Sequence, residues 1–256
     1  MLDGVRAGSA GRARVEIENA GTAAWQSHGT TGILLAYHWL DERGNAIVWD
    51  GIRTELPHSV EPGTRASVDF SLRGPIPPGR YRLAVDLVDE GRVWFGEIGS
   101  PPLESDVDVA PRIERRLAAR GGDREALAAQ EEPLVAEAEA EAIAYLSPGV
   151  APAPDWSQRV LDAHQEGYAV VGGSVEWSGG LLSRRPSELD PWSPGSGRVP
   201  GFGHPLVCPS IVVGVEPRWE GEVAGLPGAS APDGEPSIYD GRIVVTARPR
   251  SGRPRG

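Results

Sequence analysis

The chain has 256 residues, a length that suits one or two domains. Its formal net charge of −11 argues against a protein that binds nucleic acid or anionic membranes, because such a surface must attract phosphate. All 25 basic residues are arginine. The absence of lysine excludes a phosphate-loop lysine, a Schiff-base lysine and a Ser–Lys dyad.

The single cysteine, Cys208, can form neither an intrachain disulfide nor a CxxC metal motif. We interpret it as a small buried residue rather than a nucleophile. The first residues lack the hydrophobic segment of a signal peptide, and no run approaches the ~18 apolar residues of a membrane span. We therefore expect a soluble, cytoplasmic protein.

Apolar and polar residues alternate through much of the first 110 residues. The clearest segments are RARVEIEN (12–19), RASVDFSLR (65–73) and YRLAVDLV (81–88). Side chains alternate across a strand, so each segment buries one face. Turn signals separate the segments at 42–45, 61–63, 77–79 and 89–91. About seven short strands with such turns predict an all-β immunoglobulin-like sandwich over residues 1–110.

Five ordered blocks carry a resemblance to a known family: NAGTAAW (19–25), LLAYHWLDERGNAIVWDGIRTELP (34–57), VEPG (60–63), PPGRYRLAVDLVDEG (77–91) and VWFGEIG (93–99). They resemble the Trp-containing immunoglobulin-like modules fused to bacterial glycan-assembly enzymes. They are more distantly similar to the FW (four-tryptophan) domain of autophagy receptors. The resemblance implies a spacer, a docking surface or a sugar-binding module.

The tryptophans of this segment have two interpretations, since an aromatic ring can fill a sandwich core or stack on a sugar. Trp39 alternates in register with apolar neighbours and is predicted to lie in the core, as is Trp25. For Trp49 and Trp94 the pattern leaves core and surface open. Arg53 and His58 either belong to a polar patch or are single surface charges.

Residues 111–140 are rich in Ala, Glu and Arg, which favour helix. Gly121-Gly122 and Pro133 interrupt this stretch, and Asp123 is a plausible N-cap for a helix over 124–132. We expect a helical linker here.

Residues 141–247 change in character. A strand is predicted at 142–146, followed by a Pro-rich loop and a helix at 156–166 with Asp155 as its N-cap. An apolar run without alternation then begins at Tyr168, as in a buried parallel strand. This order predicts a βα crossover unit within a small α/β domain.

Three segments, AIAYL (142–146), PAPDW (152–156) and EGYAVVGGSVE (166–176), are similar in order to the middle of family-2 type GT-A glycosyltransferases. In that family the first of these strands ends in an Asp-x-Asp motif that holds a divalent metal. Here the matching positions carry Ser147, Pro148 and Gly149, which lack the carboxylates that Mg²⁺ or Mn²⁺ needs. The family's nucleotide-binding first half is also missing upstream. The resemblance therefore implies a truncated, degenerate domain without a metal site.

The remaining candidates for a site are few. Glu176 follows Gly172-Gly173 near a strand end, where ligands of parallel sheets gather, and is the best candidate for a catalytic or polar binding group. Trp192, Phe202 and His204 lie in a long Gly/Pro-rich loop at 189–205 and are candidates for binding a sugar or a partner.

These observations predict a non-catalytic accessory protein of bacterial surface-glycan assembly, a pseudoenzyme that needs no cofactor and binds a glycan or a partner glycosyltransferase. One alternative is a divergent or fragmentary glycosyltransferase that uses Mg²⁺ or Mn²⁺ and a nucleotide sugar. The other is a structural scaffold. Residues 248–256 are predicted to form a disordered basic tail.

Overall fold

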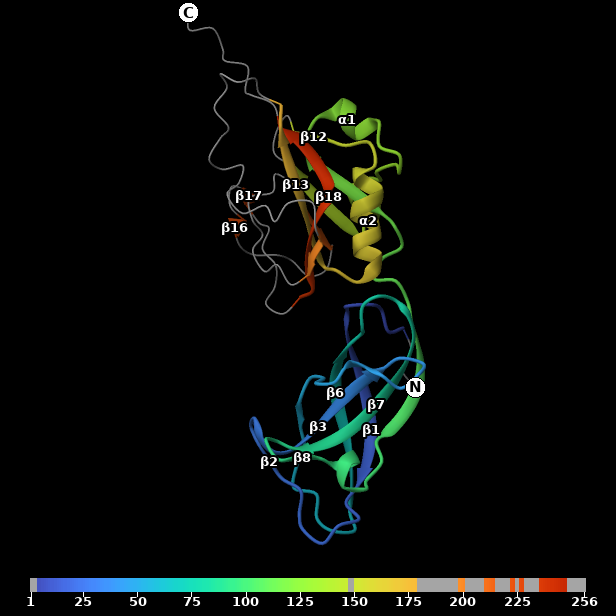
Figure 1. Cartoon of the computed structure of the whole chain (residues 1–256). Coiled ribbons are helices and arrows are strands. Elements are labelled where there is room, and N and C mark those ends of the chain that lie inside the picture. The colour runs from blue at the N-terminus through green and yellow to red at the C-terminus, as the bar shows by residue number, and fades with distance from the viewer. Residues whose placement is uncertain are drawn as a thin grey trace, which may run out of the picture. The chain divides into compact units, whose positions relative to one another are not determined.

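The computed structural model describes residues 4–146, 150–178, 198–200, 210–214, 222–223, 226–227 and 235–247. The chain divides into two compact units, Met1–Pro111 and Arg112–Gly256 (Figure 1). Strands predominate in both units, and helices are few in the described parts.

The first unit is a sandwich of two antiparallel layers. The smaller layer pairs β1 (Ala10–Glu18) with β6 (Arg65–Arg73). The larger has β7 (Gly79–Asp89) between β3 (Thr31–Leu40) and β9 (Leu103–Val109). Shorter strands extend the larger layer: β2 (Ser27–His28), β4 (Ala46–Val48), β5 (Thr54–Glu55) and β8 (Val93–Trp94).

One hydrophobic core lies between the two layers, with side chains from β1 and β6 meeting those of β3, β7 and β9. Trp39 is fully buried in it, and its indole N–H donates a hydrogen bond to the Arg73 carbonyl oxygen at 2.8 Å. The Tyr37 hydroxyl accepts from the Arg73 backbone N–H at 2.9 Å. These bonds join the layers, and the predicted core position of Trp39 is confirmed. Trp25 is half-buried and packs against the same core.

The second unit contains a mixed sheet with the strand order β10-β11-β15-β13-β18-β12, and β14 pairs with β18. The bounds are β10 (Leu117–Gly121), β11 (Ala142–Leu146), β12 (Ala151–Pro152), β13 (Val170–Trp177), β14 (Arg198–Pro200), β15 (Ser210–Gly214) and β18 (Ser237–Ala247). A separate small hairpin pairs β16 (Glu222–Val223) with β17 (Leu226–Pro227).

Helix α2 (Trp156–Glu166) follows β11 and precedes β13, as the sequence predicts. Both strands pair antiparallel with β15, which lies between them, so β11 and β13 run in the same direction. Figure 1 shows α2 against one face of this sheet, and its buried side chains join the core of the second unit. Trp156, Val160 and Leu161 are among them, all fully buried.

The start of α2 differs from the prediction in one respect. Asp155 makes no side-chain cap bond and instead accepts a hydrogen bond from Arg159 at 2.6 Å. The Ser157 backbone N–H donates to the Gln130 side-chain oxygen at 2.9 Å. A residue distant in sequence therefore satisfies an amide that the helix leaves unpaired.

The predicted helical linker at 111–140 belongs, from Arg112 onward, to the second unit. Leu117 begins β10, which pairs in parallel with β11, and Ile113 and Leu117 are buried in the core of this unit. Helix α1 (Arg124–Ala128) is shorter than expected, with Asp123 capping it as predicted. Burial of these apolar side chains in a sheet outweighs the local helical propensity, which is a weak preference.

Among the residues that the structure describes, no helix is long and apolar enough to cross a membrane. The predicted tail at 248–256 lies outside the described residues.

Candidate functional site

The outer face of the larger layer of the sandwich is the most distinctive surface of the first unit. Leu34, Ala36 and His38 of β3 and Asp86 and Val88 of β7 alternate with the residues that face the core. All five are nevertheless buried. The chain's own connecting segments, at 49–53 and 93–96, supply groups that contact this face.

Three aromatic side chains, which we call the aromatic platform, gather on this face: His38, Trp49 and Trp94. The His38 ring stacks on Trp49 with ring centres 4.1 Å apart and an interplanar angle of 23°. Trp94 meets His38 edge-on at 4.4 Å and Trp49 edge-on at 6.0 Å. Each ring thus contacts the other two in geometries that aromatic pairs favour.

Hydrogen bonds hold the platform on the sheet. His38 Nδ1–H donates to the Trp49 carbonyl oxygen, which fixes the tautomer because a carbonyl can only accept. The Gly51 backbone N–H donates to the Tyr37 carbonyl oxygen at 2.9 Å. A side chain at Gly51 would place its Cβ 2.4 Å from that oxygen, so glycine is needed for this close approach.

Charged groups surround the platform. The Arg53 guanidinium lies over the Trp94 ring, 4.7 Å from its centre, in a cation–π contact. Arg53 also pairs with Glu90 at 2.8 Å and with Asp50 at 3.0 Å. Beneath, the Asp86 carboxylate accepts from the backbone N–H groups of Leu87 and Gly96, while burial raises the pKa of this carboxyl group.

Exposure decides which ring a ligand can reach. Trp49 is 46% exposed although His38 covers one of its faces, whereas Trp94 is half-buried among Leu34, Ala36 and Val88. Trp49 is therefore a surface residue on a rigid support, and Trp94 is part of that support. A flat ring held this way can stack on the apolar face of a ligand, with Asp50 and Arg53 beside it to bind polar groups.

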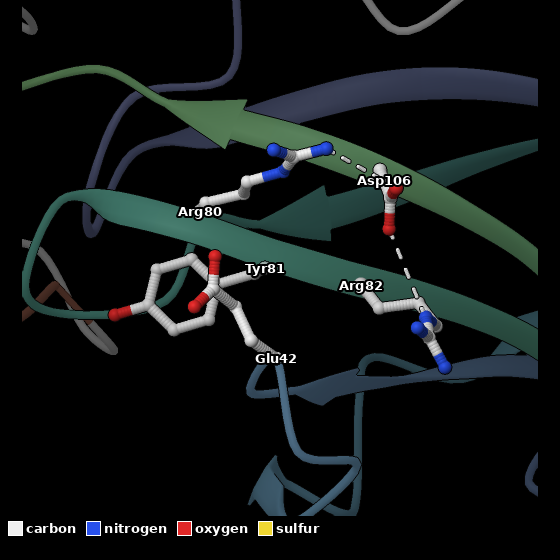
Figure 2. Close-up of a pocket in the computed structure, with 5 residues that line it drawn as sticks. All are labelled: Glu42, Arg80, Tyr81, Arg82 and Asp106. Atoms are coloured by element: carbon white, nitrogen blue, oxygen red, sulfur yellow. Dashed lines mark hydrogen bonds and ion pairs between the residues drawn. The ribbon is translucent and has the colours of Figure 1, made fainter.

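A small concavity of about 160 Å³ lies beside β7 and β9 and is lined by Glu42, Arg80, Tyr81, Arg82 and Asp106 (Figure 2). Its cations are already paired, because Asp106 lies 3.5 Å from Arg80 and 3.8 Å from Arg82. The Tyr81 hydroxyl donates to the Pro77 carbonyl oxygen, and burial raises the pKa of this hydroxyl. Internally neutralised charges in so small a space make it a weaker candidate than the aromatic platform.

The sequence-predicted site residues of the second unit are not assembled into a site by the described residues. Glu176 is exposed on β13, opposite Thr246 of β18. Trp192, Phe202 and His204 lie outside the described residues, as do the loop residues Ser147, Pro148 and Gly149. Within the described ranges, no three His, Cys, Asp or Glu side chains gather as metal ligands.

Comparison with models of known protein families and with curated protein sequences gives no match for this chain. The candidate site therefore depends on geometry alone. Trp49, Trp94 and Arg53 are candidates from the sequence, whereas His38 and Asp86 emerge only from the structure. The alternation along β3 and β7 could have indicated His38 and Asp86, because each follows or precedes a core-facing residue, Tyr37 or Leu87, and so lies on the outer face of the layer.

Proposed function

We propose that this chain is a non-catalytic binding protein whose first unit, an immunoglobulin-like module, holds a glycan on the aromatic platform. In this proposal the second unit is a degenerate glycosyltransferase-like domain. The whole chain would act as an accessory protein in the assembly of bacterial surface glycans.

The observation that carries the proposal is that the Trp49 ring is exposed and yet held in place. Its ring is about half exposed, yet it is backed by His38 and hydrogen-bonded through its own carbonyl group. A ligand that stacks on it pays little additional ordering cost, which is the benefit of a preorganised site. The C–H face of a pyranose ring offers the flat apolar surface that such a ring accepts.

The charged side chains beside Trp49, those of Asp50 and Arg53, favour a sugar over a purely apolar ligand. Asp50 is 70% exposed at its side chain and can accept hydrogen bonds from hydroxyl groups, and the Arg53 guanidinium can donate them. Few polar groups beside an aromatic surface are typical of small-ligand sites, where the ring gives affinity and the polar groups give orientation.

Two features support the place of the second unit in this proposal. Parallel strands β11 and β13 connected through α2 agree with the α/β character that the resemblance implies. The sequence Ser147-Pro148-Gly149 after β11 offers no carboxylate for a divalent cation. A divergent glycosyltransferase and a scaffold without a ligand remain the competing functions.

The test is calorimetric titration of the full chain with neutral and acidic bacterial polysaccharides that are first selected on a glycan array. We expect binding that Trp49→Ala weakens about tenfold or more, equivalent to about 1.4 kcal/mol. The matched control is Leu103→Ala, which removes an exposed apolar side chain from β9. This control should leave glycan binding unchanged, and both variants should keep the wild-type unfolding temperature.

Other results would select the competing functions. Turnover of a UDP- or GDP-sugar that Glu176→Gln abolishes, with Mn²⁺ or without metal, would favour the enzyme and refute the proposal. Absence of binding to every glycan tested would favour the scaffold. Binding that is lost in Leu103→Ala but kept in Trp49→Ala would place the glycan elsewhere on the first unit.

A further inference from the structure

A groove of about 550 Å³ opens on the side of the sandwich where β1 faces β9, away from the aromatic platform. Its floor is apolar and includes Phe70, Leu83 and Val85, all buried parts of the core. Leu103 stands at one rim and is 57% exposed. Arg12 stands at the other.

Both rims are strand edges. Within the described residues β1 pairs with β6 alone, and β9 pairs with β7 alone. Each strand therefore has one edge whose backbone N–H and C=O groups have no strand partner, and such edges are templates for a further strand.

The burial of paired residues shows that this side of the sandwich is incompletely covered. Ala13 of β1 is half-buried, whereas its partner Phe70 on β6 is buried. Leu103 of β9 is exposed, whereas its partner Val85 on β7 is buried. In both layers, the core-facing side chain on the strand next to the groove is therefore less buried than its partner on the neighbouring strand.

Residues 5–7 pair with Ala110, next to the end of β9, and so occupy one end of the gap between β1 and β9. The Ala7 N–H donates to the Ala110 carbonyl oxygen, and the Ala110 N–H donates to the Val5 carbonyl oxygen, both at 2.9 Å. Near this pairing Val107 and Val109 are buried. Farther along β9, at Leu103 and Ser105, the same row of side chains is exposed. Residues 5–7 therefore cover one end of the gap and leave the groove open beyond it.

Arg12 gives the open part of the groove its charge. Its neighbour Asp69 accepts two hydrogen bonds from Arg14, at 2.6 and 2.9 Å. Among the residues that the structure describes, the Arg12 guanidinium makes no hydrogen bond or ion pair, although the pKa of the nearby Asp69 carboxyl group is lowered most by Arg14 and further by the charge of Arg12. A carboxylate on a guest segment would complement the Arg12 guanidinium.

We propose that this groove binds an extended segment of a partner protein, which adds as a strand along β9, places aliphatic side chains against Leu83 and Val85, and presents a carboxylate to Arg12. Strand addition of this kind takes affinity from backbone hydrogen bonds and specificity from pockets for alternate side chains. A hydrocarbon chain would fill the apolar floor but leave the backbone groups of both rims and Arg12 without partners.

The experiment uses the full chain and a panel of eight-residue peptides with alternating valine and threonine, blocked at both ends, in which one polar position is glutamate, glutamine or lysine. Fluorescence anisotropy measures binding, and hydrogen exchange locates it. We expect the glutamate peptides to bind best and to protect amides of β1 and β9. Arg12→Gln should reduce the preference for glutamate over glutamine about two- to fivefold, as for an ion pair with an exposed arginine.

Ser105→Trp is the blocking variant, because Ser105 is exposed and a large ring there would fill the groove. It should abolish peptide binding without lowering the unfolding temperature, while Trp49→Ala should leave peptide binding unchanged. The proposal is overturned if no peptide of the panel binds, if Ser105→Trp binds as wild type does, or if protection appears away from β1 and β9. Displacement of all peptides by a detergent without a sugar headgroup, with no preference for glutamate, would instead assign the groove to a hydrocarbon chain. None of these results depends on glycan binding.

Discussion

Each unit buries a histidine, but the surroundings of the two side chains differ. The histidine of the first unit supports a surface that can bind a ligand, whereas that of the second unit lies in a core and lowers its stability. His38 in the first unit is 3% exposed, donates to the Trp49 carbonyl group and supports two tryptophan rings. His164 in the second unit is fully buried on α2. Its Nδ1–H donates to the Tyr168 carbonyl oxygen at 2.8 Å, but its Nε2 atom has no hydrogen-bond partner among the residues that the structure describes. A buried polar group of the first kind organises a site, whereas one of the second kind costs stability.

The tryptophans of the first unit divide in the same way, into core and surface, and this division gives the largest expected effect. Trp39→Ala removes a fully buried ring and the hydrogen bond to Arg73, so it should lower the free energy of unfolding by about 3–5 kcal/mol. Trp49→Ala should change it by less than about 1 kcal/mol, because the ring is half exposed. Denaturant titration measures both. Equal losses for the two variants would contradict the distinction between core and platform.

The burial of His164 predicts how the second unit responds to pH. Burial lowers the pKa of His164 to about 4 from an ordinary value of 6.5. Between these values the unfolded state binds more protons than the folded state. The contribution of the neutral His164 to stability is therefore fully present above pH 6.5 and is lost as the pH drops toward 4. A displacement of this size corresponds to about 3 kcal/mol at most.

Thermal unfolding of the full chain between pH 7.5 and 4.5 tests this, with tryptophan fluorescence and circular dichroism as separate probes. His164→Leu should remove most of the dependence on pH. Arg115 lowers the pKa of Glu132 in the same unit, and the stability from that carboxylate is lost at still lower pH. A transition of the second unit that is equally steep in His164→Leu would show that carboxylates control it.

Much of the fold could be predicted from sequence, because strand alternation and helix boundaries are local properties. The alternating segments at 12–19, 65–73 and 81–88 correspond to β1, β6 and β7, and the bounds of β11 and α2 agree with the prediction. The composition of 111–140 was misleading, because its helical propensity is weaker than the gain from burying Leu117 in a sheet.

The candidate site was predictable only in part. Sequence could not decide between core and surface for Trp49, because that depends on how the segment 49–53 returns across β3. Gly51 permits this return by its contact with Tyr37, fourteen positions earlier in the chain. Contacts of this kind between distant residues leave no periodic signal in a single sequence.

Glycines in strands offer a second comparison of the units. The pair Gly172-Gly173 has the sequence of a tight turn, but both residues lie within β13. A Cβ at Gly173 would lie 2.1 Å from the Ile243 carbonyl oxygen, so Gly173→Ala must displace β18 and should cost about 1–3 kcal/mol. The control is Gly11→Ala on β1, where the nearest atom is Leu72 Cγ at 3.9 Å. If both substitutions are neutral in denaturant titration, the close approach of β13 and β18 is wrong.

The smallest expected effect concerns the start of α2, where sequence and structure select different capping residues. The Gln130 side chain accepts from the Ser157 N–H and donates to the Ala126 and Ala153 carbonyl oxygens. Gln130→Ala leaves the Ser157 N–H without its partner near a buried helix end and should cost about 1–2 kcal/mol. Asp155→Ala removes a half-exposed pair with Arg159, worth about 0.5 kcal/mol or less. A larger loss of stability in Asp155→Ala than in Gln130→Ala would show that Asp155, the cap that the sequence predicts, contributes more to the start of α2 than the distant Gln130 does.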